Sequence, residues 1–257
     1  SDFIDYNNAA TYAGGQILLS GGITAANLSN ATNGVTIKGV GLNTNGVWVN
    51  NTSGVNAQAG NVYIKGVGNS TVGSSGVNIN ASAVIQASGS TGDVTIVGVA
   101  NNGTGVYING ANVVANNGSI NIYGSSLNTG AAGYGIHVAN TTQYISAKLD
   151  INIAGYAAGT GHAVYEGGLM LAGRDLSVGG YGGAGGIWFG NPGVTYAGGN
   201  LTFQNAQISS VGIASLLAGY ATATGSNAHG VTMASGTTAS TPAGGPNSGS
   251  YTGVTVG

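Results

Sequence analysis

The chain has 257 residues, of which 51 are glycine and only 4% are charged, whereas an ordinary soluble domain carries about 25% charged residues. The formal net charge is −2 and there are no cysteines, so the sequence offers no basic surface for nucleic acid and no disulfide or thiolate metal site. It also lacks an apolar run of the ~18 residues that a membrane-spanning helix needs, which predicts no membrane insertion. Hydrophobic residues make up 42% of the chain, a content that argues against disorder and predicts a packed core.

Short strand-like segments recur along the chain, beginning with Ile17–Leu19. One motif, apolar-x-apolar, begins at residues 35, 62, 94, 120, 151, 176 and 201, a mean spacing of about 28 residues. A second motif places Gly before apolar-x-apolar and lies between copies of the first: Gly46–Val49, Gly76–Ile79, Gly105–Ile108, Gly135–Val138 and Gly186–Phe189. A weaker third motif ends in Ala: Val84–Ala87, Val113–Ala115, Tyr144–Ala147 and Val194–Ala197. The alternation within each motif predicts short β-strands separated by turns.

Stacking of like motifs explains their regular recurrence, which hairpins would not. Three short strands per coil, each paired in parallel with its counterpart on the next coil, make an all-β parallel β-helix. We expect about nine or ten coils in one domain over residues 1–257, with regular coils over about 34–205 and looser coils and a loop over 206–257. In this last region Val231–Met233 and Val254–Val256 are candidate strands, and Ser235–Ser250 is expected to be a long loop.

Two segments of the repeat, Ala59–Gly66 (Ala-Gly-Asn-Val-Tyr-Ile-Lys-Gly) and Thr91–Gly98 (Thr-Gly-Asp-Val-Thr-Ile-Val-Gly), carry a family resemblance. They resemble the haemagglutinin repeats of filamentous-haemagglutinin-like exoproteins, the adhesins of bacterial two-partner secretion, over about residues 34–205. The resemblance implies a right-handed β-helix that is exported across the outer membrane. It also implies adhesion, or the presentation of a toxin at a distance from the cell.

The few charged residues gather near the start of the apolar-x-apolar strands. Asp93, Asp150 and Asp175 directly precede such a strand, and Lys148 and Arg174 lie beside the last two. Carboxylates on successive coils, about 5 Å apart, could serve retaining glycoside hydrolysis or could bind Ca²⁺. Stacked acids with a nearby base also resemble those of β-helical pectin-degrading enzymes. We favour a structural ladder, because Asn, Asp and Ser side chains at turns bond to nearby backbone.

The outward position of the Gly-apolar-x-apolar motif is rich in aromatic residues. It holds Trp48, Tyr107, His137 and, after one irregular coil, Trp188. Stacked coils would bring these residues into one stripe, whose flat rings suit the faces of sugars or a partner subunit. Alternatively, neighbouring rings only cover each other and the sheet. The histidines share no metal-ligand spacing, so we expect no metal and no cofactor.

These features predict a secreted, non-catalytic bacterial adhesin or stalk segment at the cell surface. Its partner would be a glycan or the surface of a host or neighbouring cell. The alternative is a subunit of an extracellular filament or surface layer that joins copies of itself end to end, because charges are depleted where protein surfaces pack together and an uncapped β-helix exposes strand edges. A polysaccharide-active enzyme that uses Asp150 and Asp175 is a minor alternative.

Overall fold

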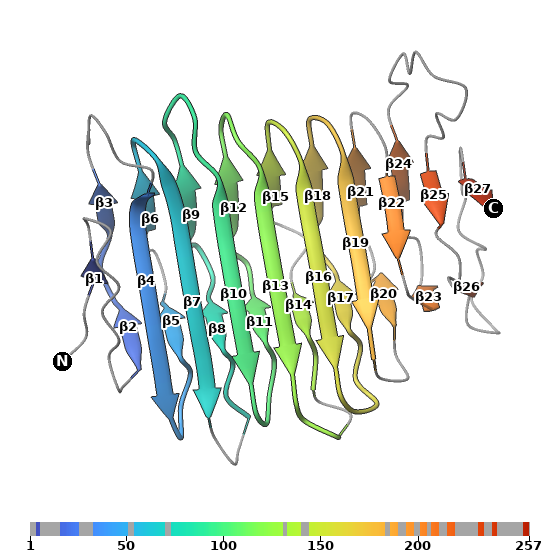
Figure 1. Ribbon diagram of the computed structural model, residues 1–257, viewed down its shortest axis with the longest axis horizontal. Helices are drawn as coiled ribbons and strands as arrows, with labels where there is room; N and C mark the ends of the chain where they lie inside the picture. The colour runs from blue at the N-terminus through green and yellow to red at the C-terminus, as the bar shows by residue number, and fades with distance from the viewer. Residues whose placement is uncertain are drawn as a thin grey trace.

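The computed structural model describes residues 4–5, 16–25, 33–50, 54–69, 73–130, 133–139, 144–182 and 186–189, and the strand segments 194–197, 201–204, 207–210, 215–218, 231–233, 238–240 and 254–256. Over these residues the chain is a parallel β-solenoid in which successive strands pass in turn to three sheets, here named A, B and C (Figure 1). This confirms the predicted all-β solenoid with three strands per coil. None of the described residues forms a helix long and apolar enough to cross a membrane.

The three sheets differ in the length of their strands. Sheet A has the longest: β1 (Ile4–Asp5), β4 (Asn33–Leu42), β7 (Asn61–Asn69), β10 (Val94–Ala100), β13 (Ile120–Ser126), β16 (Ile151–Ala157), β19 (Leu176–Tyr181), β22 (Leu201–Gln204), β25 (Val231–Met233) and β27 (Val254–Val256). Sheet B has mostly three-residue strands: β2 (Ile17–Leu19), β5 (Val47–Val49), β8 (Val77–Ile79), β11 (Val106–Ile108), β14 (Ile136–Val138), β17 (Val164–Glu166), β20 (Ile187–Phe189), β23 (Gln207–Ser210) and β26 (Thr238–Ser240). Sheet C consists of β3 (Ile23–Ala25), β6 (Gly54–Ala57), β9 (Val84–Ala87), β12 (Asn112–Ala115), β15 (Tyr144–Ala147), β18 (Leu169–Ala172), β21 (Val194–Ala197) and β24 (Ser215–Ala218).

Equivalent positions of the repeat lie directly over one another. Every described strand pair is parallel except β1 with β4, and Ile64, Ile96 and Ile122 pair in register across sheet A. Backbone hydrogen bonds between coils continue through the turn from sheet A to sheet B, for example from Val77 N to Gly105 O at 3.0 Å. Each position in a strand therefore becomes a row of side chains that runs along the solenoid.

The core is built from the inward rows. Alternate residues of the strands are buried, as in β10 and β11, and the largest fully buried side chains are isoleucines that stack on their equivalents in neighbouring coils. Burying one such side chain stabilises a fold by roughly 1.5–3 kcal/mol. The inward Val, Ile and Leu ladders that the sequence predicts are therefore confirmed, and sheet C adds a ladder of small residues: Ala57, Ala87, Ala115, Ala147 and Ala172.

Glycine forms a row of its own where sheet A turns into sheet B. The row lies inside sheet A and consists of Gly39, Gly66, Gly98, Gly124, Gly155 and Gly180. A Cβ at Gly98 would overlap the carbonyl group of Gly105, and a Cβ at Gly124 would overlap that of Gly135. The backbones of the two sheets thus touch at this corner, and only glycine fits at these positions of the sheet A strands.

The number of coils is the main correction to the sequence analysis. About five or six coils are seen with described side chains in all three sheets, not nine or ten, and after β22 only separate strand segments are described. Val231–Met233 and Val254–Val256 do form β25 and β27, but the segment expected to be a loop contains β26. The division into domains stays a prediction.

The glycine row provides a direct test of the close contact between sheets A and B. We expect Gly98→Ala to lower the free energy of unfolding by about 3 kcal/mol, because the added methyl group overpacks against backbone that cannot rotate away. Gly54→Ala is the matched control, since its Cβ would lie 3.6 Å from Val84 O, an ordinary contact. Urea titrations followed by circular dichroism measure both variants. Equal stability of the two would contradict the proposed contact.

Candidate functional site

The predicted aromatic stripe lies on the outer face of sheet B. Tyr107, His137, Tyr165 and Trp188 occupy the central, outward position of β11, β14, β17 and β20, and the register pairs each with the next. All four are half-buried. The ring centroids of Tyr107 and His137 are 5.0 Å apart, and those of His137 and Tyr165 are 4.7 Å apart. The stripe is therefore continuous over four coils.

A second aromatic row runs beside the first along the turn from sheet A to sheet B. Tyr134 and His162 directly precede the residues at which sheet B begins, and backbone hydrogen bonds fix them: Gly105 N donates to Tyr134 O and Gly135 N donates to His162 O. The Tyr134 ring lies 4.7 Å from His137, and the His162 ring lies 4.8 Å from Trp188. We call the six residues of both rows the aromatic stripe: Tyr107, Tyr134, His137, His162, Tyr165 and Trp188.

Trp48 shares the outward position of sheet B but lies apart from the stripe. It is two coils before Tyr107, and Asn78 separates the two in the register. The indole Nε1 of Trp48 is buried and has no hydrogen-bond partner. The structure thus brings Tyr107, His137 and Trp188 into one surface and leaves Trp48 outside it.

Sequence analysis missed three members of the stripe. It treated the coil before Trp188 as irregular, because Ala163 stands where other coils have Gly and Glu166 stands where they have an apolar residue. Allowing Ala for Gly would have revealed Tyr165. Tyr134 and His162 lie at a turn, outside any strand motif, so only their shared position directly before sheet B could have identified them.

His137 is the most perturbed base of the stripe. Burial, and to a lesser degree the nearby imidazole of His162, lower the pKa of His137 to about 4. Its ring is packed between Tyr107, Tyr134 and Tyr165. At neutral pH the centre of the stripe is therefore an uncharged aromatic surface.

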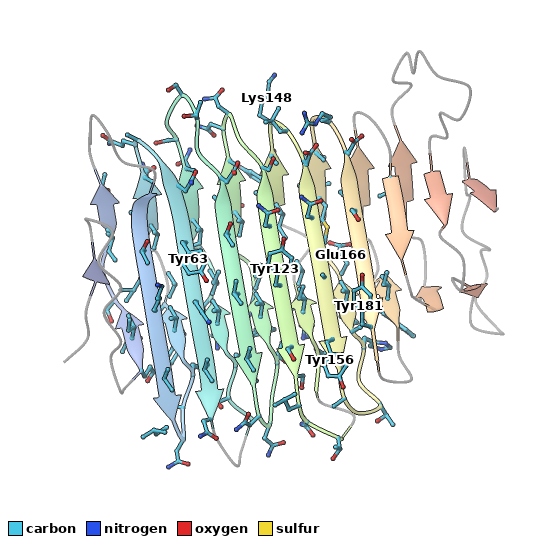
Figure 2. All side chains as sticks on the ribbon, viewed as in Figure 1. Tyr63, Tyr123, Lys148, Tyr156, Glu166 and Tyr181 are labelled. Atoms are coloured by element: carbon cyan, nitrogen blue, oxygen red, sulfur yellow. The ribbon has the colours of Figure 1, made fainter. Side chains whose placement is uncertain are left out.

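Glu166 lies inside the solenoid directly behind the stripe. It is the last residue of β17, points inward at a position where β14 has Val138, and is 1% exposed (Figure 2). Its Oε1 accepts a hydrogen bond from Gly168 N at 2.7 Å, whereas Oε2 is buried without a partner. Burial raises the pKa of this carboxyl group to about 8, so it is protonated at neutral pH.

Glu166 and His137 predict a stability maximum at mildly acidic pH. Folded Glu166 keeps its proton between its unfolded pKa of 4.5 and about 8, so stability falls as the pH rises through this range. Folded His137 releases its proton below its unfolded pKa of 6.5, so it costs stability as the pH falls from 6.5 to about 4. The two effects oppose each other between 4.5 and 6.5, and each has a limiting slope on the order of 1 kcal/mol per pH unit.

Thermal unfolding between pH 4 and pH 9 measures this profile. We expect the Tm of the parent protein to fall above pH 6.5, and Glu166→Gln to remove most of that fall because the amide does not titrate. His137→Asn should extend the fall of the Tm downward to about pH 4.5, because the opposing effect of His137 between pH 4.5 and pH 6.5 is removed. A parent Tm that is constant from pH 6.5 to pH 9 would show that Glu166 is ionised or accessible to water.

The charged residues before the sheet A strands form a different kind of row. Asp93 N donates to Asn61 Oδ1 at 2.8 Å, and Ser119 N donates to Asp93 Oδ1 at 2.7 Å. Asp150 N in turn donates to Ser119 Oγ at 3.4 Å, and Asp175 N donates to Asp150 Oδ1 at 3.2 Å. Each side chain thus binds the backbone of the following coil, which is how a turn ladder stabilises a solenoid.

The carboxylate of Asp150 is also held by a cation. The Arg174 guanidinium binds both of its oxygens, through Nε at 2.6 Å and through a shorter bond from the terminal nitrogen. Arg174 lowers the pKa of Asp150, which suits a structural anion rather than a general acid. Lys148 is exposed and projects from the corner of the solenoid (Figure 2). Among the described residues, no three His, Asp or Glu side chains are placed to hold a metal ion.

The ladder should contribute more to the free energy of unfolding than the ion pair between Asp150 and Arg174. Asp93→Ala removes the acceptor of the half-buried Ser119 N–H, and we expect a loss of about 1–2 kcal/mol in the free energy of unfolding. Arg174→Ala removes a pair whose arginine side chain is 57% exposed, so we expect a smaller loss than for Asp93→Ala because solvent screens the pair. Urea titrations measure both, and a larger loss for Arg174→Ala would contradict the ladder as the main source of stability at this corner.

The fold and the site together define a three-sheeted parallel β-solenoid with a neutral aromatic stripe on one face. Comparisons of the chain with models of known protein families, with curated proteins and with solved structures found no match. The assignment of a function therefore depends on the chemistry of its surfaces.

Proposed function

We propose that the chain is a non-catalytic, extracellular segment of a bacterial cell-surface adhesin or stalk, and that it binds glycan through the aromatic stripe. The observation that carries the proposal is the unbroken row of half-buried rings on β11, β14, β17 and β20. We further propose a right-handed coil, because parallel β-crossovers almost always have this hand. The repeated segments Ala59–Gly66 and Thr91–Gly98 occupy equivalent turns and strands of adjacent coils, which supports relating them to haemagglutinin repeats.

The spacing of the stripe favours an extended polysaccharide. Coils of a parallel sheet repeat at about 4.8 Å, which is close to the length that one pyranose ring occupies along an extended glycan. Each ring of the row on β11, β14, β17 and β20 can thus contact one sugar. Aromatic rings also combine an apolar face for the axial hydrogens of a sugar with polar groups for its hydroxyls, and Tyr107, His137 and Tyr165 supply both.

The arrangement of the acids supports a non-catalytic role. Glycoside hydrolysis needs two carboxyl groups that reach the same bond, one of them protonated. The protonated acid, Glu166, is sealed inside the core, and Asp150 is bound by Arg174. The alternative expectation, end-to-end assembly into a filament or layer, depends on terminal coils whose side chains lie outside the described residues.

Binding of the full chain to insoluble cellulose, insoluble chitin and a glycan array tests the proposal. We expect at least one extended polysaccharide to bind, and Tyr165→Ala or Trp188→Ala to weaken that binding by at least about tenfold, as for aromatic residues at the centre of an interface. Tyr144→Ala is the matched control, because Tyr144 is 40% exposed on sheet C, away from the stripe.

Circular dichroism melts accompany these measurements, so that a variant that fails to fold is recognised. Folded Tyr165→Ala and Trp188→Ala proteins that bind as tightly as the parent would show that the rings only cover the sheet. Release of reducing or unsaturated sugar ends, abolished by Asp175→Asn, would instead identify an enzyme.

A further inference from the structure

The outer face of sheet A carries few charged side chains over the described strands. Its outward residues form three rows across β4, β7, β10, β13, β16 and β19. The first row is Thr36, Tyr63, Thr95, Asn121, Asn152 and Ser177; the second is Lys38, Lys65, Val97, Tyr123, Ala154 and Gly179; the third is Val40, Val67, Val99, Ser125, Tyr156 and Tyr181. These rows contain no acid, and their charges are confined to the two lysines at the amino-terminal end.

Large apolar side chains are concentrated on this face. Tyr123, Tyr156 and Tyr181 are 43%, 41% and 37% exposed, and Leu127, at the end of the same sheet, is 49% exposed. Figure 2 shows the three tyrosines side by side on the long strands. The Tyr181 ring folds back over Gly179, where an added Cβ would lie 2.9 Å from it. Glycine at this position lets the ring lie against the sheet, which keeps the face flat.

We propose that sheet A is an interface on which a second copy of this chain packs face to face. Seven residues at about 3.3 Å along each strand and six strands at about 4.8 Å give a face of roughly 650 Å². Two copies would bury roughly 1,300 Å² in total, which falls in the range of about 1,200–2,000 Å² for specific interfaces. The uncharged centre of the face adds no cost for burying charges, and its tyrosines are of a residue type enriched at interfaces.

The two lysines determine the orientation of the second copy. A two-fold axis along the solenoid would make the two copies run parallel. The second row of one copy would then face the second row of the other, and Lys38 and Lys65 would each meet their own equivalent. A two-fold axis along the strands would make the copies run antiparallel. Each row would then face the same row of the other copy, with the first coil opposite the last, and the lysines would lie near Tyr156 and Tyr181 of the partner. The antiparallel dimer therefore replaces like-charge repulsion by cation–π contacts, of the kind that Lys38 already makes with Tyr63 at 5.7 Å.

Sedimentation equilibrium of the full chain over a range of concentrations tests the interface. We expect a dimer of twice 24.8 kDa, and at least tenfold weaker association for Tyr123→Glu and for Tyr156→Glu. Tyr144→Glu is the matched control, because Tyr144 has the same exposure as Tyr156 but lies on sheet C. Circular dichroism melts establish that each variant is folded.

A short bis-maleimide linker tests the orientation, since the chain has no cysteine of its own. Val99→Cys lies in the third row near the centre of the face, so two copies cross-link only in the antiparallel dimer. Lys38→Cys lies in the middle row at one end, where the antiparallel arrangement separates its two copies by about five coils, or roughly 24 Å. We expect a covalent dimer for Val99→Cys and none for Lys38→Cys.

Three results would overturn the proposal. The first is a parent chain that remains monomeric at all concentrations. The second is association that Tyr144→Glu weakens as much as Tyr156→Glu, or that neither sheet A variant weakens, as an end-to-end polymer would behave. The third is cross-linking of Lys38→Cys in place of Val99→Cys. None of these results depends on glycan binding, because sheets A and B present different residues.

Discussion

The contact between backbones at the turn from sheet A to sheet B determines how the rest of the solenoid is arranged. Where Gly98 lies against Gly105, and Gly124 against Gly135, no side chain separates the two sheets. The two sheets therefore approach each other closely in each of these coils although the connecting turns differ in length, and coil-to-coil hydrogen bonds continue at the start of sheet B. Because sheet B begins at a fixed distance from sheet A, its outward positions stack without slipping. A surface of aligned rings becomes possible only on such a regular support.

In-register stacking turns single residues of the repeat into continuous surfaces with separate roles. The position before each sheet A strand becomes a ladder of Asn, Asp and Ser that binds the backbone of the next coil. The middle of each sheet B strand becomes the aromatic stripe, and alternate positions of sheet A become its flat outer face. Polar ladders of this kind satisfy half-buried backbone groups with one side chain per coil, so the coils stay in register although only 4% of the residues are charged.

The fold was readable from the sequence wherever a local pattern repeats. Alternation within Val94–Ile96 and its equivalents identified the strands, and the spacing of the motifs identified the stacking. The site was only partly readable, because the coil at Ala163–Glu166 breaks the pattern with a small residue in place of Gly and an acid in place of an apolar residue. Tyr134 and His162 escaped notice because turns have no period, and their alignment with the stripe follows only from the backbone bonds across coils.

The coil that contains Ala163–Glu166 also connects the stability of the fold to the candidate site. Tyr165 and Glu166 are adjacent in β17 and point in opposite directions, one into the stripe and one into the core. A carboxylate in an apolar interior is too costly to persist there, so its ionisation requires water. We expect water to reach Glu166 when β17 separates from β14 and β20, a movement that also breaks the contact between Tyr165 and His137. The highest pH at which the structure around β17 persists is therefore also the highest pH at which the aromatic stripe stays intact.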